Sequence, residues 1–136
     1  MAEVTKGTAK PAVATRSPGY EHRINGLVAG EAIAAGDACR IHTDGKAYKA
    51  SGAAANANAI VRGFAATDAS SGEAVTLMRG VVFGYKPLVS STAMNPGAQL
   101  YLSGTVAGGL ADTASTGGTT PIAFVIDTDG RIMLTV

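Results

Sequence analysis

Short apolar runs separated by glycine-containing turns fill the chain from residue 24 to its end. In 36–50, the dipeptide Asp44-Gly45 separates two such runs and favours a hairpin, because glycine accepts the positive φ that the turn requires. Gly accounts for 18 of the 136 residues and aromatic residues for only 5%, which suits short strands and many turns. The pattern predicts an all-β domain with a small barrel or sandwich body, and a short helical turn is compatible with the alanine-rich segment 51–59.

The apolar runs also predict details of the individual strands. Gly80 and Gly84 lie inside one run and indicate a bulge, a bend or a break there. The run 121–127 is apolar on both faces, with Phe124 on one and Val125 on the other, which is typical of a central strand. The last run places Ile132, Leu134 and Val136 on one face. The expected strands after the first hairpin are 59–67, 73–85, 97–104, 108–113, 121–127 and 131–136.

A weak internal repeat relates the two halves of the chain. The stretch 32–41 (AIAAGDACRI) aligns with 93–102 (AMNPGAQLYL) at an offset of 61 residues, which places Phe64 on Val125. The stretch 73–78 (EAVTLM) resembles 131–136 (RIMLTV) at an offset of 58. Both halves are therefore expected to be β meanders.

Charge and cysteine content argue against several classes of function. The formal net charge is +1, so we expect no basic surface for nucleic acid. Cys39 is the only cysteine, which excludes an intrachain disulfide. No apolar run approaches the roughly 18–20 residues of a membrane span, and the N-terminus lacks a signal-peptide core. We expect neither membrane insertion nor secretion.

Residues 1–23 differ from the rest of the chain. They are rich in Thr, Lys, Ala and Pro and show neither a helical nor an alternating apolar period. Pro11 and Pro18 favour extended backbone, and the segment cannot bury enough apolar surface to order on its own. We interpret it as a flexible arm, either a plain leader or a segment that orders on a partner; 24–136 is the folded domain.

The glycine-rich stretch 104–112 (GTVAGGLAD) raises the question of a phosphate-binding loop. It lacks the Lys and the Ser/Thr of a P-loop, and no helical pattern follows it. A hairpin turn explains the glycines better. In the strand before it, Leu100 and Leu102 should face the core, with Gln99, Tyr101 and Ser103 on the other face.

Other candidate site residues do not form a recognisable chemical motif. Cys39 and His42 supply two ligands where structural zinc needs four, and they should point to opposite faces of a strand. Asp127 and Asp129 flank the last turn, but DTDGR lacks the closing Glu of a calcium loop. No metal, cofactor or catalytic residue is predicted. A further polar–aromatic group is either an interaction patch or an ordinary strand face: Arg79, Tyr85 and Lys86.

Taken in order, the stretches of this chain resemble the head-decoration (cement) proteins of tailed bacteriophages, including the lambda-type proteins. After the arm, the resemblance lies in 29–50 (AGEAIAAGDACRIHTDGKAYKA) and 59–88 (AIVRGFAATDASSGEAVTLMRGVVFGYKPL). It continues in 94–113 (MNPGAQLYLSGTVAGGLADT) and 121–136 (PIAFVIDTDGRIMLTV). It covers roughly residues 24–136 and rests on turns and strands rather than on a chemical signature.

The resemblance implies a small β-rich, β-tulip-like domain without enzymatic activity. The protein would be made in the host cytoplasm and bound to the outer surface of the virion capsid. Its partners would be the major capsid protein and further copies of itself, as a trimer or alternatively a dimer. The arm would be the capsid-binding segment, with three basic residues that meet acidic capsid surface and three residues that fix an extended path: Lys6, Lys10, Arg16, and Pro11, Pro18, Tyr20.

Two other functions stay open at this point. The chain could be another phage structural protein, such as a head-fibre base or a tail module. It could also be a small enzyme or a ligand-binding barrel of unknown substrate, although the sequence offers no convergent set of polar groups for one.

Overall fold

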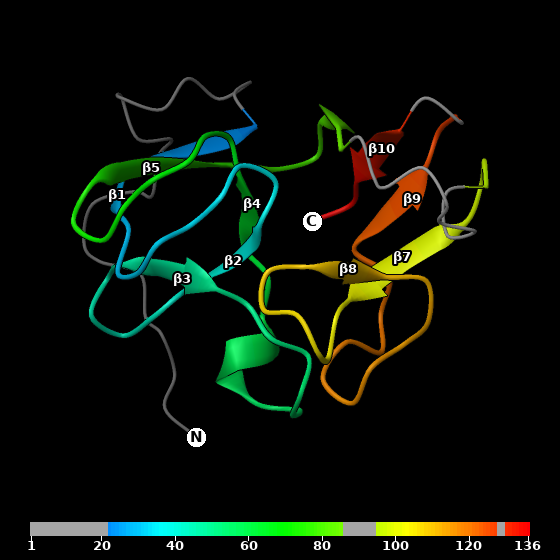
Figure 1. Cartoon of the computed structure of the whole chain (residues 1–136), viewed down its shortest axis with the longest axis horizontal. Coiled ribbons are helices and arrows are strands. Elements are labelled where there is room, and N and C mark those ends of the chain that lie inside the picture. The colour runs from blue at the N-terminus through cyan, green and yellow to red at the C-terminus, as the bar shows by residue number, and fades with distance from the viewer. Residues whose placement is uncertain (1–21, 86–94, 128–129) are drawn as a thin grey trace, which may run out of the picture.

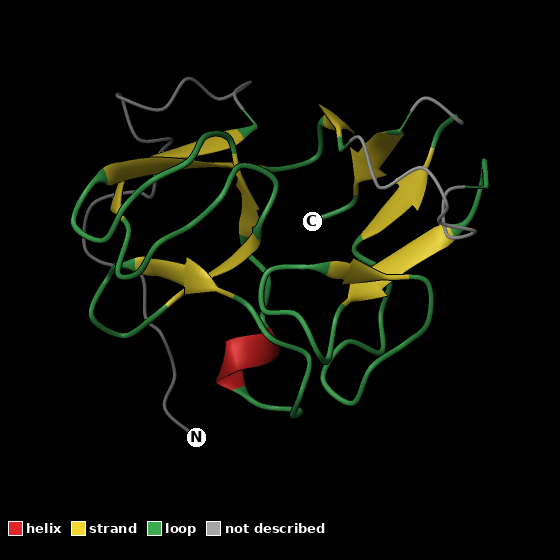
Figure 2. Cartoon of the chain, viewed as in Figure 1, coloured by secondary structure: helices red, strands yellow, loops and turns green. Residues whose placement is uncertain are grey.

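The computed structural model describes residues 22–85, 95–127 and 130–136, which contain ten short strands and one 3-10 turn (Figures 1 and 2). The first five strands are β1 (Arg23–Val28), β2 (Ala38–Ile41), β3 (Ala47–Lys49), β4 (Gly63–Ala65) and β5 (Ala74–Met78). The other five are β6 (Val82–Gly84), β7 (Gln99–Leu102), β8 (Leu110–Ala111), β9 (Ala123–Val125) and β10 (Arg131–Leu134). The 3-10 turn η1 (Ala57–Ala59) lies in the alanine-rich segment, where a helical turn was compatible with the sequence. The predicted all-β class is confirmed.

The strands form two antiparallel five-stranded sheets, one in each half of the molecule (Figure 1). We call 22–79 with β1–β5 the first lobe, and 81–136 with β6–β10 the second lobe. Gly80, with φ +56°, separates β5 of one sheet from β6 of the other, so the predicted break in this run is confirmed. Neither sheet closes into a barrel.

Asp44-Gly45 forms the predicted hairpin between β2 and β3. The two strands pair antiparallel, with Ile41 opposite Ala47. Gly45 has φ +81°, and the Asp44 carboxylate accepts the backbone N–H of Lys46 at 2.9 Å. The turn is therefore held by the two residues that predicted it.

The two sheets repeat the same topology. Their strand orders are β1-β5-β4-β2-β3 and β6-β10-β9-β7-β8, so each strand has a counterpart five strands later in the chain. The registers identify equivalent residues. Phe64 pairs with Met78 and Ala38, whereas Phe124 pairs with Met133 and Gln99. The predicted repeat of two β meanders is thus present as a structural repeat.

The residue alignment predicted for the second half of the repeat was wrong. Phe64 corresponds to Phe124, not to Val125, and Met78 corresponds to Met133, not to Val136 as the offset of 58 required. Short apolar stretches can be aligned with one another almost equally well after small shifts, so the sequence alone does not determine which residues of the two halves correspond.

Each lobe has its own apolar core. The core of the first lobe lies on one face of its sheet and consists of Ala29, Ile33, Cys39, Ala47, Ala65, Ala69, Val75 and Leu77. The core of the second lobe is built from Leu100, Leu102, Ala123, Val125, Ile132 and Leu134, joined by Ala38, Ala50 and Phe64 of the first lobe. The opposite face of the first sheet therefore packs into the core of the second lobe.

Close backbone contacts also join the lobes. The Ala38 N–H donates to the Gly108 carbonyl at 2.8 Å, and the Gly108 N–H donates to the Ala50 carbonyl at 2.7 Å. Nearby, the Gly52 N–H donates to the Ser103 carbonyl at 2.9 Å. A Cβ on Gly52 would lie 2.9 Å from the Leu102 carbonyl oxygen, so only glycine allows this approach.

Strand β9 is central in its sheet, as its sequence predicted, but only one of its faces is buried. Ala123 and Val125 are 1% exposed, whereas Phe124 is 40% exposed. The prediction that this run is a central strand is confirmed, and its apolar composition does not require both faces to be buried. The last strand does bury Ile132 and Leu134 together, as predicted.

Candidate functional site

The predicted capsid-binding residues lie outside the described part of the chain. These are Lys6, Lys10, Pro11, Arg16, Pro18 and Tyr20. The described chain begins at His22, and β1 begins at Arg23, next to the predicted start of the folded domain.

Cys39 and His42 diverge, as their spacing predicted. Cys39 is fully buried in the first core, and its Sγ donates to the Asp37 carbonyl at 3.3 Å. Burial, followed by the charge of Asp37, raises the pKa of this thiol to about 12. His42 is exposed on the hairpin, where its ring meets Tyr48 edge-on. The thiol is therefore protonated at neutral pH and unsuited to nucleophilic or metal chemistry.

The glycine-rich stretch after β7 is a hairpin turn. Leu100 and Leu102 are buried as predicted, and Gly108 has φ +77°. Ser103 is also buried, against the prediction that it faces away from the core. The strand ends at Leu102, and the Ser103 hydroxyl turns back to accept the backbone N–H of Val106 at 3.0 Å. This serine stabilises the turn.

The last turn shows no arrangement of calcium ligands. The Asp127 carboxylate accepts the Arg131 Nε–H at 2.6 Å and the Arg131 backbone N–H at 3.3 Å. Asp129 lies outside the described residues. Within the ranges that the structure describes, no three His, Cys, Asp or Glu side chains are grouped so that they could hold a metal ion.

Arg79 and Tyr85 have different surroundings. Arg79 lines a cleft of about 560 Å³ between the two lobes, with His22, Arg23 and the C-terminal residues 134–136. Tyr85 is half-buried against the second core, and burial raises its pKa. Lys86, the third residue of this polar–aromatic group, lies outside the described residues.

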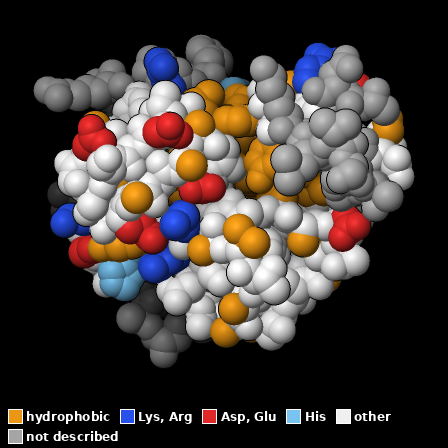
Figure 3. Space-filling model, viewed as in Figure 1, with side chains coloured by type: hydrophobic (Ala, Val, Ile, Leu, Met, Phe, Trp, Pro, Cys, Tyr) orange, Lys and Arg blue, Asp and Glu red, His pale blue; other side chains and the backbone are white. Residues whose placement is uncertain are grey.

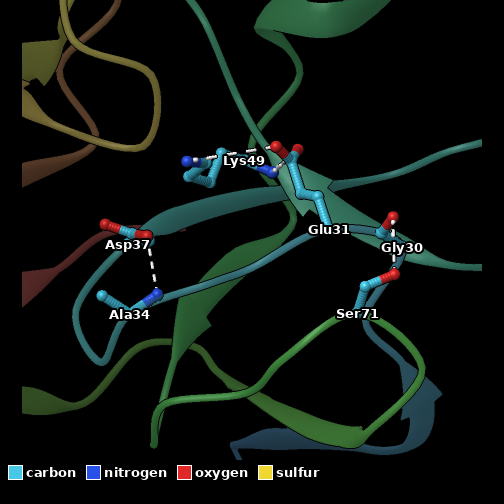
Figure 4. A network of polar contacts seen from close by, with 6 residues as sticks. All are labelled: Gly30, Glu31, Ala34, Asp37, Lys49 and Ser71. Carbon is cyan, nitrogen blue, oxygen red and sulfur yellow. Dashed lines mark hydrogen bonds and ion pairs between the residues drawn. The ribbon is translucent and has the colours of Figure 1, made fainter.

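A groove of about 400 Å³ in the first lobe is lined by three carboxylates, but each of them is used by a turn. Asp37 accepts the Ala34 N–H, as Figure 4 shows, and Asp68 accepts the Ala35 N–H. Glu73 accepts the Ser70 N–H at 2.6 Å, which lowers its pKa. These side chains stabilise the loops that cover the first core rather than forming a reactive site.

A second polar cluster lies on the first hairpin and was missed by the sequence analysis. The Arg40 guanidinium lies 5.0 Å from the ring centroid of Tyr48, its cross-strand partner. The Tyr48 hydroxyl donates to the Asp44 carboxylate at 2.6 Å; this bond raises the pKa of Tyr48 and lowers that of Asp44. The signal for this contact is the register of the predicted hairpin, which pairs positions 40 and 48.

An apolar row crosses the second sheet, and the polar contacts do not explain it. Val82, Met133 and Phe124 are direct cross-strand partners on β6, β10 and β9, and we call them the Phe124 row. Val82 is 53% exposed and Phe124 is 40% exposed. The equivalent residues of the first sheet are Arg23, Met78 and Phe64, and we call them the Phe64 row.

The two equivalent rows have different environments. Phe64 is fully buried in the second core, whereas its counterpart Phe124 is 40% exposed among the described residues. Charge is also distributed unevenly. Charged side chains gather over the first lobe in the view of Figure 3. Among the described residues, the first lobe carries eleven Asp, Glu, Lys and Arg side chains and the second only Asp112, Asp127 and Arg131.

Comparisons with known proteins add no family. A scan against protein-family models finds no match to this chain. A search of curated proteins finds no significant match either. Among the described residues, no helix is long and apolar enough to cross a membrane.

Proposed function

We propose that this chain is a decoration (cement) protein of a tailed-bacteriophage head. In this proposal it binds the outer surface of the assembled capsid, bridges neighbouring subunits of the major capsid protein and stabilises the shell without catalysing a reaction. The observation that carries the proposal is the exposed Phe124 row on a lobe with few charges, because such a face is typical of a protein-binding surface.

The construction of the body supports a binding role. Hydrogen bonds and glycine contacts join the two lobes, and the carboxylates of the first lobe fix its loops. A rigid body of this kind loses little conformational entropy when it binds. The resemblance over residues 24–136 specifies the partner as the shell of a phage head.

The N-terminal arm supplies a further contact with the capsid in this proposal, beside that of the Phe124 row. Lys6, Lys10 and Arg16 provide positive charge, and the prolines favour an extended path across neighbouring subunits. A segment that orders on its partner covers a large area at modest affinity. Because the protein binds only the assembled shell in this proposal, a free protein concentration of 100 times Kd stabilises each site of the shell by about 2.7 kcal/mol.

Head binding tests this function. Purified protein is mixed with expanded heads that lack it, and the melting temperature of the heads is followed by fluorescence. We expect cosedimentation and a saturable rise in melting temperature. No rise at saturating protein would overturn the proposal, and label on the tail in electron micrographs of virions would replace it by a tail module.

Deleting residues 2–20 tests the arm separately. The truncated protein should keep the circular dichroism and thermal unfolding of the full chain, since the described body begins at residue 22. Its affinity for heads should fall. The matched control is Lys46→Ala, which removes an exposed positive charge from the tip of the first hairpin and should leave head binding unchanged. An unchanged affinity of the deletion variant would show that the arm is only a leader.

A further inference from the structure

An asparagine followed by glycine lies in the irregular part of strand β1. Asn25-Gly26 is the one Asn-Gly dipeptide of the sequence. β1 is the outer strand of the first sheet, beside β5 (Figure 1). The register between these two strands skips Asn25 and Gly26, which together face Thr76 of β5. Two residues of one strand opposite one residue of its partner are a β-bulge, so the dipeptide is the bulge of this pair.

The bulge leaves the dipeptide exposed and loosely held. Asn25 and Gly26 are both exposed, and Gly26 has φ +81°. A Cβ placed on Gly26 would have no atom within 4 Å apart from those of its chain neighbours. A bulge disrupts the ladder of hydrogen bonds, and an outer strand has a partner on one side only. The backbone nitrogen of Gly26 can therefore approach the side chain of Asn25.

The reaction open to this pair is cyclisation. The Gly26 backbone nitrogen attacks the Asn25 side-chain carbonyl carbon and forms a new C–N bond. The bond from that carbon to the side-chain nitrogen breaks, and ammonia leaves with the proton of the Gly26 N–H. Water then adds to either carbonyl carbon of the resulting succinimide and opens it to aspartate or isoaspartate. No electrons are gained or lost, and glycine favours the attack because it has no Cβ to crowd the nitrogen.

Thr76 contacts the carbonyl group that is attacked. Its hydroxyl donates to the Asn25 Oδ1 at 3.3 Å. Negative charge develops on this oxygen as the nitrogen adds, so a donor there stabilises the transition state more than the ground state. Thr76 lies opposite the bulge, so the same irregularity of the sheet brings the donor and the nucleophile to one carbonyl group.

We propose that Asn25 is a self-modification site, which cyclises with Gly26 in the folded protein and opens to aspartate or isoaspartate, with Thr76 as the donor to the developing oxyanion. Aspartate adds a negative charge to β1, and isoaspartate also lengthens its main chain by one methylene group. The change lies at the start of the folded body, next to the arm 1–23. It needs only solvent water, and it does not rest on the proposed function.

Peptide mass spectrometry of the full-length chain tests the site. The native protein is incubated in neutral buffer and digested with trypsin at intervals, and a sample without incubation sets the baseline. Trypsin releases 24–40, in which Asn25 is the only asparagine, and 50–62, which contains Asn56 and Asn58. The first peptide should gain the mass of an amide-to-acid exchange and separate into two chromatographic forms. The second should keep its mass, because its exposed asparagines are each followed by alanine.

Thr76→Val tests the donor, and Thr135→Val is the matched control. Thr76→Val keeps the shape of the side chain but removes the hydroxyl. It should slow the conversion of Asn25 about threefold to tenfold, the effect of losing one hydrogen bond. Thr135→Val removes a hydroxyl that donates to the Pro121 carbonyl in the second lobe, and should leave the rate unchanged. Neither threonine is buried, so both variants should keep the circular dichroism of the wild type.

Two results would overturn the proposed site. One is conversion of Asn25 no faster than that of Asn56 and Asn58. The other is conversion of Asn25 only after the protein is unfolded in urea. A rate for Thr76→Val equal to or above that of the wild type would overturn the role of Thr76. None of these results bears on head binding, so the two proposals fail separately.

Discussion

Phe64 and Phe124 allow a matched test of how the two lobes are joined. They are the same residue type at equivalent positions of the repeat, each between a Met on one neighbouring strand and β2 or β7 on the other. Phe64 belongs to the first lobe and is fully buried in the core of the second lobe, whereas Phe124 of the second lobe is 40% exposed. The two alanine variants therefore compare the same truncation at a site that the other lobe covers and at a site that it leaves exposed.

The expected losses of stability differ. Phe64→Ala removes a fully buried ring and leaves a cavity between the lobes, which should cost about 3–5 kcal/mol. Phe124→Ala loses only the buried part of its transfer free energy, about 1–2 kcal/mol, and opens no closed cavity because the site faces solvent. The difference in the free energy of unfolding should be about 2 kcal/mol or more.

Urea denaturation followed by circular dichroism measures this difference. With a slope of about 1–3 kcal/mol per molar urea, a difference of about 2 kcal/mol should separate the two midpoints by about 0.7–2 M. If the two variants lose the same stability, the first sheet does not pack into the second core as described. A larger loss for Phe124→Ala would contradict the assignment of the exposed row.

Three further predictions concern the glycines, the thiol and the hairpin. Gly52→Ala should lower the free energy of unfolding by about 1–3 kcal/mol, because the added Cβ meets the Leu102 carbonyl oxygen. The control Gly84→Ala has open space around the added Cβ and should change the free energy of unfolding by less than about 1 kcal/mol, so equal urea midpoints of the two variants would refute the contact. Cys39 should resist thiol reagents in the native protein and react once per chain after unfolding, and fast labelling of the native protein would contradict its burial. Because its folded pKa is raised from 9.0 to about 12, the stability that the thiol contributes is present below pH 9 and is lost as the pH rises toward 12. The hydrogen bond from Tyr48 lowers the pKa of Asp44 in the folded protein, so the stability that this carboxylate contributes is present above the ordinary value of 3.8 and is lost as the pH falls through the folded pKa. Asp44→Asn should therefore weaken the dependence of the melting temperature on acid pH. An unchanged pH profile would show that the bond from Tyr48 does not contribute.

Local signals in the sequence predicted much of the fold. Asp44-Gly45, Gly80 and the alternating residues Leu100 and Leu102 each act through their own backbone geometry, which needs no knowledge of the rest of the chain. The repeat was detectable for the same reason, since turn glycines recur before corresponding strands. The central position of β9 also followed from its apolar composition.

The environments of Phe64 and Phe124 could not be predicted in this way. Both phenylalanines lie in short apolar strands, and only the packing of one lobe on the other buries the first and exposes the second. The hydrogen bonds of Ser103 likewise depend on where β7 ends, which periodicity defines only to within a few residues. The candidate arm residues stay a prediction, because they lie outside the described chain.

The most direct test of the proposed function is a cryo-electron microscopy reconstruction of tailed-phage virions assembled with and without this protein. The account predicts two-lobed density at symmetry-related positions on the outer surface of the head, in contact with more than one capsid subunit and missing from particles made without the protein. Density on the tail, or heads that are identical with and without the protein, would contradict it.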